Sequence, residues 1–149
     1  MNGAWVLPAN ESHKRLFLEL AETVRGQGGQ ATILSGAEVA DDMVAVKGKF
    51  VADRIREYEE FQDRCAAFLA EIAKERKLKK FTFAELEEID DDFVKLSKWL
   101  QKIVARDFFP NDHKRKAEGT LKRCDGARLA FAAAVYVAEG IDSEKTKNK

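Results

Sequence analysis

The stretch YEEFQDRCAAFLAEI, residues 58–72, decides the fold expected for this chain. Its apolar side chains recur three and four residues apart, at Tyr58, Phe61, Cys65, Phe68 and Ile72. A repeat of about 3.5 residues places one apolar seam along a helix, and helices with such seams pack side by side. The stretch therefore predicts a long helix that begins near residue 41 and ends in the basic segment at residues 74–80.

A second seam follows a clear helix start. Thr82 is the expected N-cap, and Glu85 three residues later completes a capping box. Phe81 and Leu86 stand where a hydrophobic staple requires them. The apolar residues of this helix are again three and four apart, at Leu86, Ile89, Phe93, Leu96, Leu100 and Ile103. We expect the helix to end at the Asp-Phe-Phe-Pro of residues 107–110.

A third helix is expected from about residue 112 to residue 139. Its candidate core residues are Leu121, Cys124, Phe131, Val135 and Ala138. Gly119 and Gly126 each cost about 1 kcal/mol relative to alanine in a helix interior, so a break near either stays open. Connections of a few residues make successive helices antiparallel. Residues 41–140 are therefore predicted to form a long antiparallel three-helix bundle.

The first 40 residues are expected to form a strand, a helix and a second strand. Residues 4–7 (AWVL) and 31–34 (ATIL) are the two short strands. Asn10 or Ser12 can cap the helix between them, and its apolar stripe consists of Leu16, Phe17, Leu20, Ala21 and Val24. The predicted fold class is thus α+β and predominantly helical, a small β-α-β element joined to the bundle.

Glycines bound this small element on both sides. Gly28 and Gly29 end its helix, as glycine commonly does at a helix C-terminus. Asn2-Gly3 is typical of a two-residue hairpin turn, because both residues tolerate positive φ. A hairpin needs a strand on each side of its turn, and only Met1 precedes this one. The turn therefore predicts a neighbouring strand that these residues do not supply.

Length and composition suit one cytoplasmic domain. The 149 residues can bury a core of their own, with residues 141–149 expected as a disordered tail. Lysine plus arginine number 26, as do aspartate plus glutamate, so the whole molecule is not an obvious polyanion binder. No apolar run approaches the roughly 18 residues of a membrane span, and no signal peptide opens the chain. We expect a cytoplasmic protein without a membrane partner.

Few residues could carry catalysis or hold a metal. His13 and His113 lack metal-ligand spacing, and the acids of residues 87–92 lie on a predicted helix, where successive carboxylates diverge. Cys65 and Cys124 are expected to be buried free thiols, with a disulfide or a redox pair as the alternatives. Glycine-rich phosphate loops and nucleophile motifs are absent from the sequence. We therefore expect no enzyme, no metal and no cofactor.

Two basic clusters remain as a candidate site, one in residues 74–80 and one early in the last helix. If both lie at the same end of the bundle, they form one positive surface that can contact phosphate. The alternative is that these charges solvate helix ends. The candidate nucleic-acid-binding residues are Lys77, Lys79, Lys80, Lys114, Arg115, Lys116, Lys122 and Arg123.

Several of these pieces, in this order, resemble the N-terminal domain of ChrB-type chromate-resistance proteins. The resemblance spans about residues 3–139 and is carried by Trp-Val-Leu-Pro at 5–8, Gly28-Gly29, residues 31–34 and Asp-Phe-Phe-Pro at 107–110. It implies a link to the control of chromate-resistance genes. If the fold is ferredoxin-like, the two strands here flank a first strand that lies upstream.

The chain departs from the family pattern at both ends. The family's domain begins earlier, with a strand, a helix and another strand, and it usually carries a C-terminal domain for which the residues after Gly140 leave no room. Three explanations stay open: a start codon assigned too late, a shortened paralogue whose strands pair directly, or a second subunit that supplies the strand.

The expected function is a non-enzymatic regulatory module, a transcriptional regulator fragment whose partner is DNA. The alternative is a protein-interaction or oligomerisation module that self-associates through exposed strand edges and the bundle surface, without nucleic-acid binding.

Overall fold

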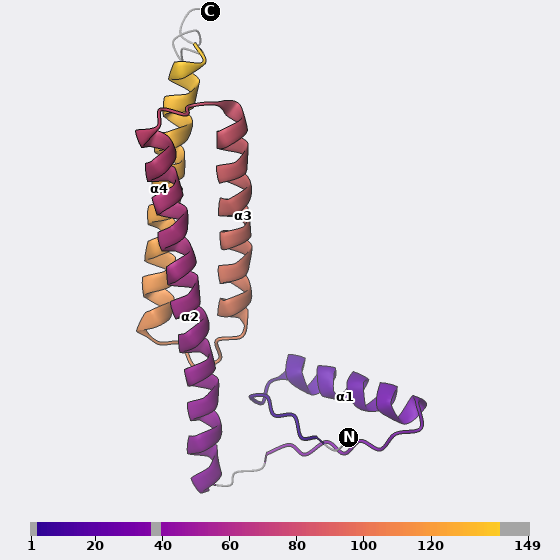
Figure 1. The fold of residues 1–149 in the computed structure, drawn as a ribbon. Coiled ribbons are helices and arrows are strands. Elements are labelled where there is room, and N and C mark those ends of the chain that lie inside the picture. The colour runs from indigo at the N-terminus through magenta and orange to yellow at the C-terminus, as the bar shows by residue number, and fades with distance from the viewer. Residues whose placement is uncertain (1–2, 37–39, 141–149) are drawn as a thin grey trace, which may run out of the picture. The chain divides into compact units, whose positions relative to one another are not determined.

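The computed structural model describes residues 3–36 and 40–140 of the chain. These residues contain four helices and no strand: α1 (Glu11–Gly26), α2 (Ala40–Lys77), α3 (Phe83–Ala105) and α4 (Asp112–Ala138) (Figure 1). The chain divides into two compact units, Met1–Val46 and Lys47–Lys149. The first unit contains α1, and the second contains α3, α4 and most of α2.

Helix α1 begins and ends where local sequence signals predict. Asn10 is the N-cap, because its Oδ1 accepts a hydrogen bond from the His13 backbone N–H at 2.7 Å. At the other end the N–H of Gly29 donates to the carbonyl of Val24 at 2.8 Å, and Gly28 has a φ of 79°. This conformation satisfies the last carbonyls of the helix and favours glycine, which has no Cβ to oppose it.

The strands expected at residues 4–7 and 31–34 are not formed, so the predicted β-α-β element and its ferredoxin-like arrangement are wrong for the described chain. A strand is stabilised by hydrogen bonds to a neighbouring strand and by one buried face, and these segments have neither. Trp5 is 81% exposed and Leu34 is 84% exposed. The expected turn residue Asn2 and the expected tail at residues 141–149 lie outside the described residues.

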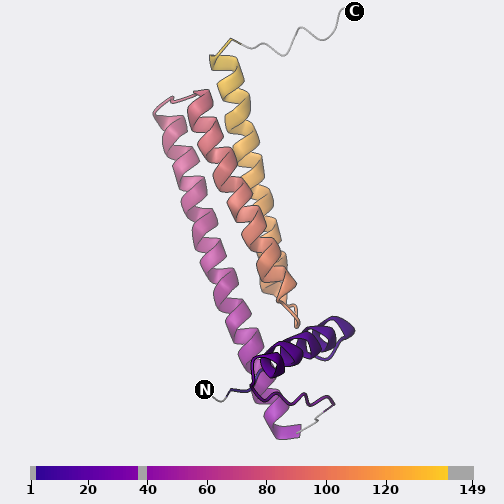
Figure 2. The same ribbon diagram turned by 90° about the vertical axis from the view of Figure 1, so that its right-hand side faces the viewer.

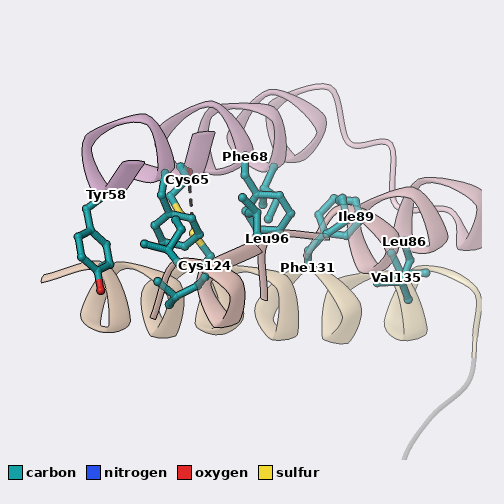
Figure 3. Packing of buried hydrophobic residues seen from close by; sticks show 14 residues of the cluster. Tyr58, Cys65, Phe68, Leu86, Ile89, Leu96, Cys124, Phe131 and Val135 are labelled. Carbon is teal, nitrogen blue, oxygen red and sulfur yellow. Dashed lines mark hydrogen bonds between the residues drawn. The ribbon is translucent and has the colours of Figure 1, made fainter. Parts of the chain in front are cut away.

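In the second unit, α2, α3 and α4 form the predicted three-helix bundle. Helix α3 runs opposite to α2 and α4, as both views show (Figures 1 and 2). The predicted seams supply most of its buried core (Figure 3), which consists of Tyr58, Phe61, Cys65, Phe68, Ile72, Leu86, Ile89, Leu96, Leu100, Ile103, Ala117, Cys124, Phe131 and Val135. Phe93 and Leu121 are partly buried, whereas Ala138 is exposed and lies outside the core.

The α3–α4 turn, which contains Asp-Phe-Phe-Pro, is held against α2. The Tyr58 hydroxyl donates to Asp107 Oδ2 at 2.9 Å. The Phe50 ring packs edge-on against Phe108 and Phe109, with centroids 5.9 and 6.2 Å away. Lys47 Nζ lies 5.1 Å from the Phe109 ring centroid. Aromatic packing and a hydrogen bond therefore hold the α3–α4 turn against α2 at this end of the bundle.

The α2–α3 turn at the other end places Lys79 at a φ of 55°. The N–H groups of Lys79 and Lys80 donate to the carbonyls of Arg76 and Glu75 at 3.1 and 3.0 Å, which closes the C-terminus of α2. The first half of the expected capping box also forms, since Thr82 Oγ1 accepts from the Glu85 N–H at 3.3 Å. These bonds set the sharp reversal between the two helices.

We expect Lys79→Gly to raise the free energy of unfolding by about 0.5–1 kcal/mol, because the left-handed conformation strains a residue with a Cβ. The midpoint of urea unfolding measures this change. Lys98→Gly is the matched control, and we expect it to lower the unfolding free energy by about 1 kcal/mol in the interior of α3. Destabilisation of similar size by both variants would contradict the role of the turn conformation.

Candidate nucleic-acid interface

The eight candidate cations lie in two groups at opposite ends of the bundle. Helices α2 and α4 run in the same direction, so the end of α2 and the start of α4 cannot meet (Figure 1). The Thr120 hydroxyl on α4 donates to Gln62 on α2 at 2.7 Å, and Lys77 lies roughly 22 Å further along α2 at about 1.5 Å per residue. The single positive surface expected from both clusters therefore does not form.

Carboxylates neutralise much of the basic cluster at the α2–α3 turn. Lys80 Nζ lies 3.1 Å from Glu75 Oε2 and 3.4 Å from Glu85 Oε1, and Lys74 Nζ lies 2.8 Å from Glu71 Oε1. Lys77 and Lys79 form no ion pair with a described residue. Carboxylates therefore pair with Lys74 and Lys80, whereas Lys77 and Lys79 stay exposed at this turn.

Glu75 explains the charge balance of this turn. It is 2% exposed and is the one buried charged residue in the described ranges. Burial raises the pKa of its carboxyl, but Lys80 and Lys74 outweigh burial and hold the pKa below its usual range. The carboxylate therefore stays ionised at neutral pH, and it draws two lysine ammonium groups toward the protein.

The second group of cations forms an exposed surface on the first half of α4. This surface, the basic face of α4, consists of Arg115, Lys116, Gly119, Lys122, Arg123 and Gly126, all exposed. Buried Ala117 and Cys124 lie on the opposite side of the same helix. Lys114 is half-buried beside this face, and its Nζ lies 4.0 Å from Glu118 Oε1. The helix therefore separates its core residues from its cations.

Most cations of the basic face are available to an external partner. Arg115 pairs with Asp112 at 2.8 Å, and both side chains are largely exposed. Within the described ranges, Lys116, Lys122 and Arg123 take part in no ion pair. An exposed pair such as that of Arg115 is worth only about 0–1 kcal/mol, so its guanidinium can exchange partners at little cost.

A groove that sequence reasoning missed lies between α2 and α3. Its volume is about 650 Å³, with Phe68, Ile89 and Trp99 among its apolar lining residues. Arg64 and Lys95 are its lining cations, against the carboxylates of Glu71, Glu75, Glu85, Glu88 and Asp92. The lining comes from two helices, so no single stretch of sequence signals it. Lys74, Lys80 and Lys95 pair with four of these five carboxylates, so the groove carries little net charge.

The two cysteines meet in the centre of the core (Figure 3). Both are fully buried free thiols, and Cys124 Sγ lies 3.9 Å from the carbonyl oxygen of Cys65. Burial raises the pKa of Cys65 to about 12, with a further contribution from Cys124, and burial also raises the pKa of Cys124. Both thiols are therefore protonated at neutral pH, which suits packing and opposes nucleophilic chemistry.

The histidines lie at helix starts. The backbone N–H of His113 donates to Oδ1 of Asn111, the N-cap of α4, at 2.9 Å, and His13 Nδ1 lies 2.7 Å from the carbonyl of Pro8. In the ranges that the structure describes, no three histidine, cysteine, aspartate or glutamate residues are grouped as a metal site requires. None of the described helices is both long and apolar enough to cross a bilayer.

Fold and surface together define a helical-bundle module with an exposed basic face and a buried apolar core. The chain belongs to the family of ChrB N-terminal domains, because the family model for the N-terminal part of protein ChrB matches residues 1–141. The resemblance drawn from the sequence motifs is thereby confirmed, and membership makes the chain a regulatory module related to chromate resistance. Comparisons with curated proteins and with solved structures gave no match.

Proposed function

We propose that this chain is a non-enzymatic module that regulates transcription by binding DNA through the basic face of α4. The observation that supports this function is the grouping of four exposed cations, Arg115, Lys116, Lys122 and Arg123, on one side of a single helix. Family membership supports a regulatory role related to chromate resistance, and the basic face supplies a surface through which such a role can be exercised.

Local charge is what makes this surface suitable for DNA. The chain as a whole carries no net formal charge, so long-range attraction by the whole molecule contributes little. Four cations that each neutralise one phosphate release condensed counterions and give a salt slope of roughly −3 to −4.

The double variant Lys122→Glu/Arg123→Glu is expected to weaken DNA binding at least about tenfold and to reduce the salt slope by about 2, because two phosphate contacts are lost. Fluorescence anisotropy with a labelled 20-base-pair duplex at several salt concentrations measures both quantities. Lys98→Glu/Lys102→Glu on α3 is the matched control, with the same change in net charge. Equal loss in both double variants would contradict a site on α4.

A reporter gene under a chromate-resistance promoter tests the regulatory part of the proposal. The α4 variant should shift reporter expression toward the level seen without the protein, whereas the α3 control should behave as the unmodified chain. If the α4 variant regulates the reporter as the unmodified chain does, the regulatory role does not depend on DNA binding by this face.

A protein-interaction module is the second candidate function, and the first unit carries the observation that favours it. Trp5 and Leu34 are 81% and 84% exposed, and Leu16, Leu18 and Leu20 on α1 are about half exposed. Large apolar side chains left exposed in one small unit are candidates for contact with another protein. Sedimentation equilibrium distinguishes this function from the first. If the chain associates with itself, and if Trp5→Ser and Leu34→Ser abolish that association, the interaction function is supported. A monomer at every concentration would argue against self-association.

A further inference from the structure

Gly119 and Gly126 have no packing role in the bundle. A Cβ placed on either residue meets no atom within 4 Å, and neither residue has positive φ. Glycine is nonetheless the least favourable helix residue after proline. Neither a turn nor an internal close approach requires glycine at these two positions, and the helix surface above them is open.

The two glycines lie on the centre line of the basic face of α4. At about 3.6 residues per turn, Arg115 and Lys122 form one column along the helix and Lys116 and Arg123 form another. Gly119 and Gly126 fall between the two columns. The helix surface is therefore bare along a line that cations flank on both sides, and an anionic chain can lie there close to the helix backbone.

The bare centre line also bears on which part of DNA is contacted. When a helix reads sequence, the side chains at the centre of its contact face reach base edges in the major groove. Here the centre of the face has no side chain, and Lys and Arg stand only at its margins. Cations at such positions contact phosphates, which position a protein without reading the sequence.

We propose that the sugar–phosphate backbone of duplex DNA passes over Gly119 and Gly126, between the two columns of cations, so that this face binds DNA without reading sequence. The inference rests on the DNA-binding role proposed above and specifies which part of the DNA the face takes. The module then contributes affinity, and another segment or partner selects the site.

The test replaces both glycines by a neutral residue that fills the centre line. In Gly119→Gln/Gly126→Gln the cations remain, so we expect at least about tenfold weaker binding to a 20-base-pair duplex with an unchanged salt slope. The urea midpoint should rise or stay constant, because glutamine favours the helix more than glycine does. Gly48→Gln is the matched control, since Gly48 is also an exposed helix glycine at which an added Cβ meets no atom within 4 Å.

The outcomes separate this inference from the function on which it rests. If the charge-reversal variant binds weakly while the glycine variant binds like the unmodified chain, the approach over the glycines is wrong and DNA binding by the face stands. If neither variant weakens binding, DNA binding through this face is itself wrong. Tenfold preference of the unmodified chain for one of two unrelated duplexes would overturn the absence of sequence reading. We expect the unmodified chain to bind the two duplexes with equal affinity. Gly119→Gln/Gly126→Gln should bind both more weakly, and Gly48→Gln should bind both as the unmodified chain does.

Discussion

Replacement of Phe131 by alanine is expected to lower the free energy of unfolding by about 3–5 kcal/mol, because it removes a large buried side chain and leaves a cavity. Phe131 on α4 is fully buried, and its ring centroid lies 5.6 Å from that of Phe81, which precedes α3. The ring therefore joins the α2–α3 turn to the C-terminal half of α4. The loss should exceed that of a typical substitution, which is near 1 kcal/mol.

Urea unfolding followed by far-UV circular dichroism measures this loss, and Phe83→Ala is the matched control. Phe83 is 43% exposed, and its ring contacts Tyr136 edge-on at a centroid distance of 5.7 Å. We expect the control to cost about 1 kcal/mol or less, since a half-exposed ring buries less apolar area. Equal losses in the two variants would show that the core seen around Phe131 does not hold the bundle together.

Cys65 in the folded protein is expected to react with iodoacetamide roughly a thousandfold more slowly than free cysteine at pH 8. The thiolate is the reactive form, and burial raises the pKa of Cys65 to about 12, so the thiolate fraction falls by about three orders of magnitude. Complete burial of the side chain slows the reaction further. The rate should rise about tenfold per pH unit above pH 8, because the thiolate fraction does so below the pKa.

Mass spectrometry of the alkylated protein over time measures this reaction, and the same protein in urea is the control. We expect both Cys65 and Cys124 to be modified quickly once the chain unfolds. Rapid labelling of the native protein would contradict the burial of the two cysteines. Such a result would favour the redox pair that the sequence leaves open.

The helices of the bundle were predictable from the sequence because their signals are local. Tyr58, Phe61 and Cys65 are spaced three and four residues apart, as in an apolar seam between packed helices, and all three are buried. Thr82 caps α3 as expected, through a bond to a residue three positions away. Signals of this kind depend on neighbours within two helical turns, so a single sequence contains them in full.

The prediction of the small N-terminal β-α-β element was wrong because strands depend on partners far away in the sequence. Residues 4–7 and 31–34 have the composition of strands, but a strand exists only where another strand supplies its hydrogen bonds. No local pattern reports whether that neighbour is present. The same limitation applies to the basic clusters, because relative helix direction decides whether Lys80 and Lys116 share one end of the bundle.

The amino-acid sequence by itself determined the four helices, most of the residues that face the bundle core and the family to which the chain belongs, since periodicity, caps and ordered motifs are properties of the chain read in order. Only the tertiary structure decided which charges act together. It buried Glu75 beside Lys80, assembled the groove from α2 and α3, and exposed Gly119 between two columns of cations. Charge and exposure depend on distances through space, and those distances exist only after the helices have packed.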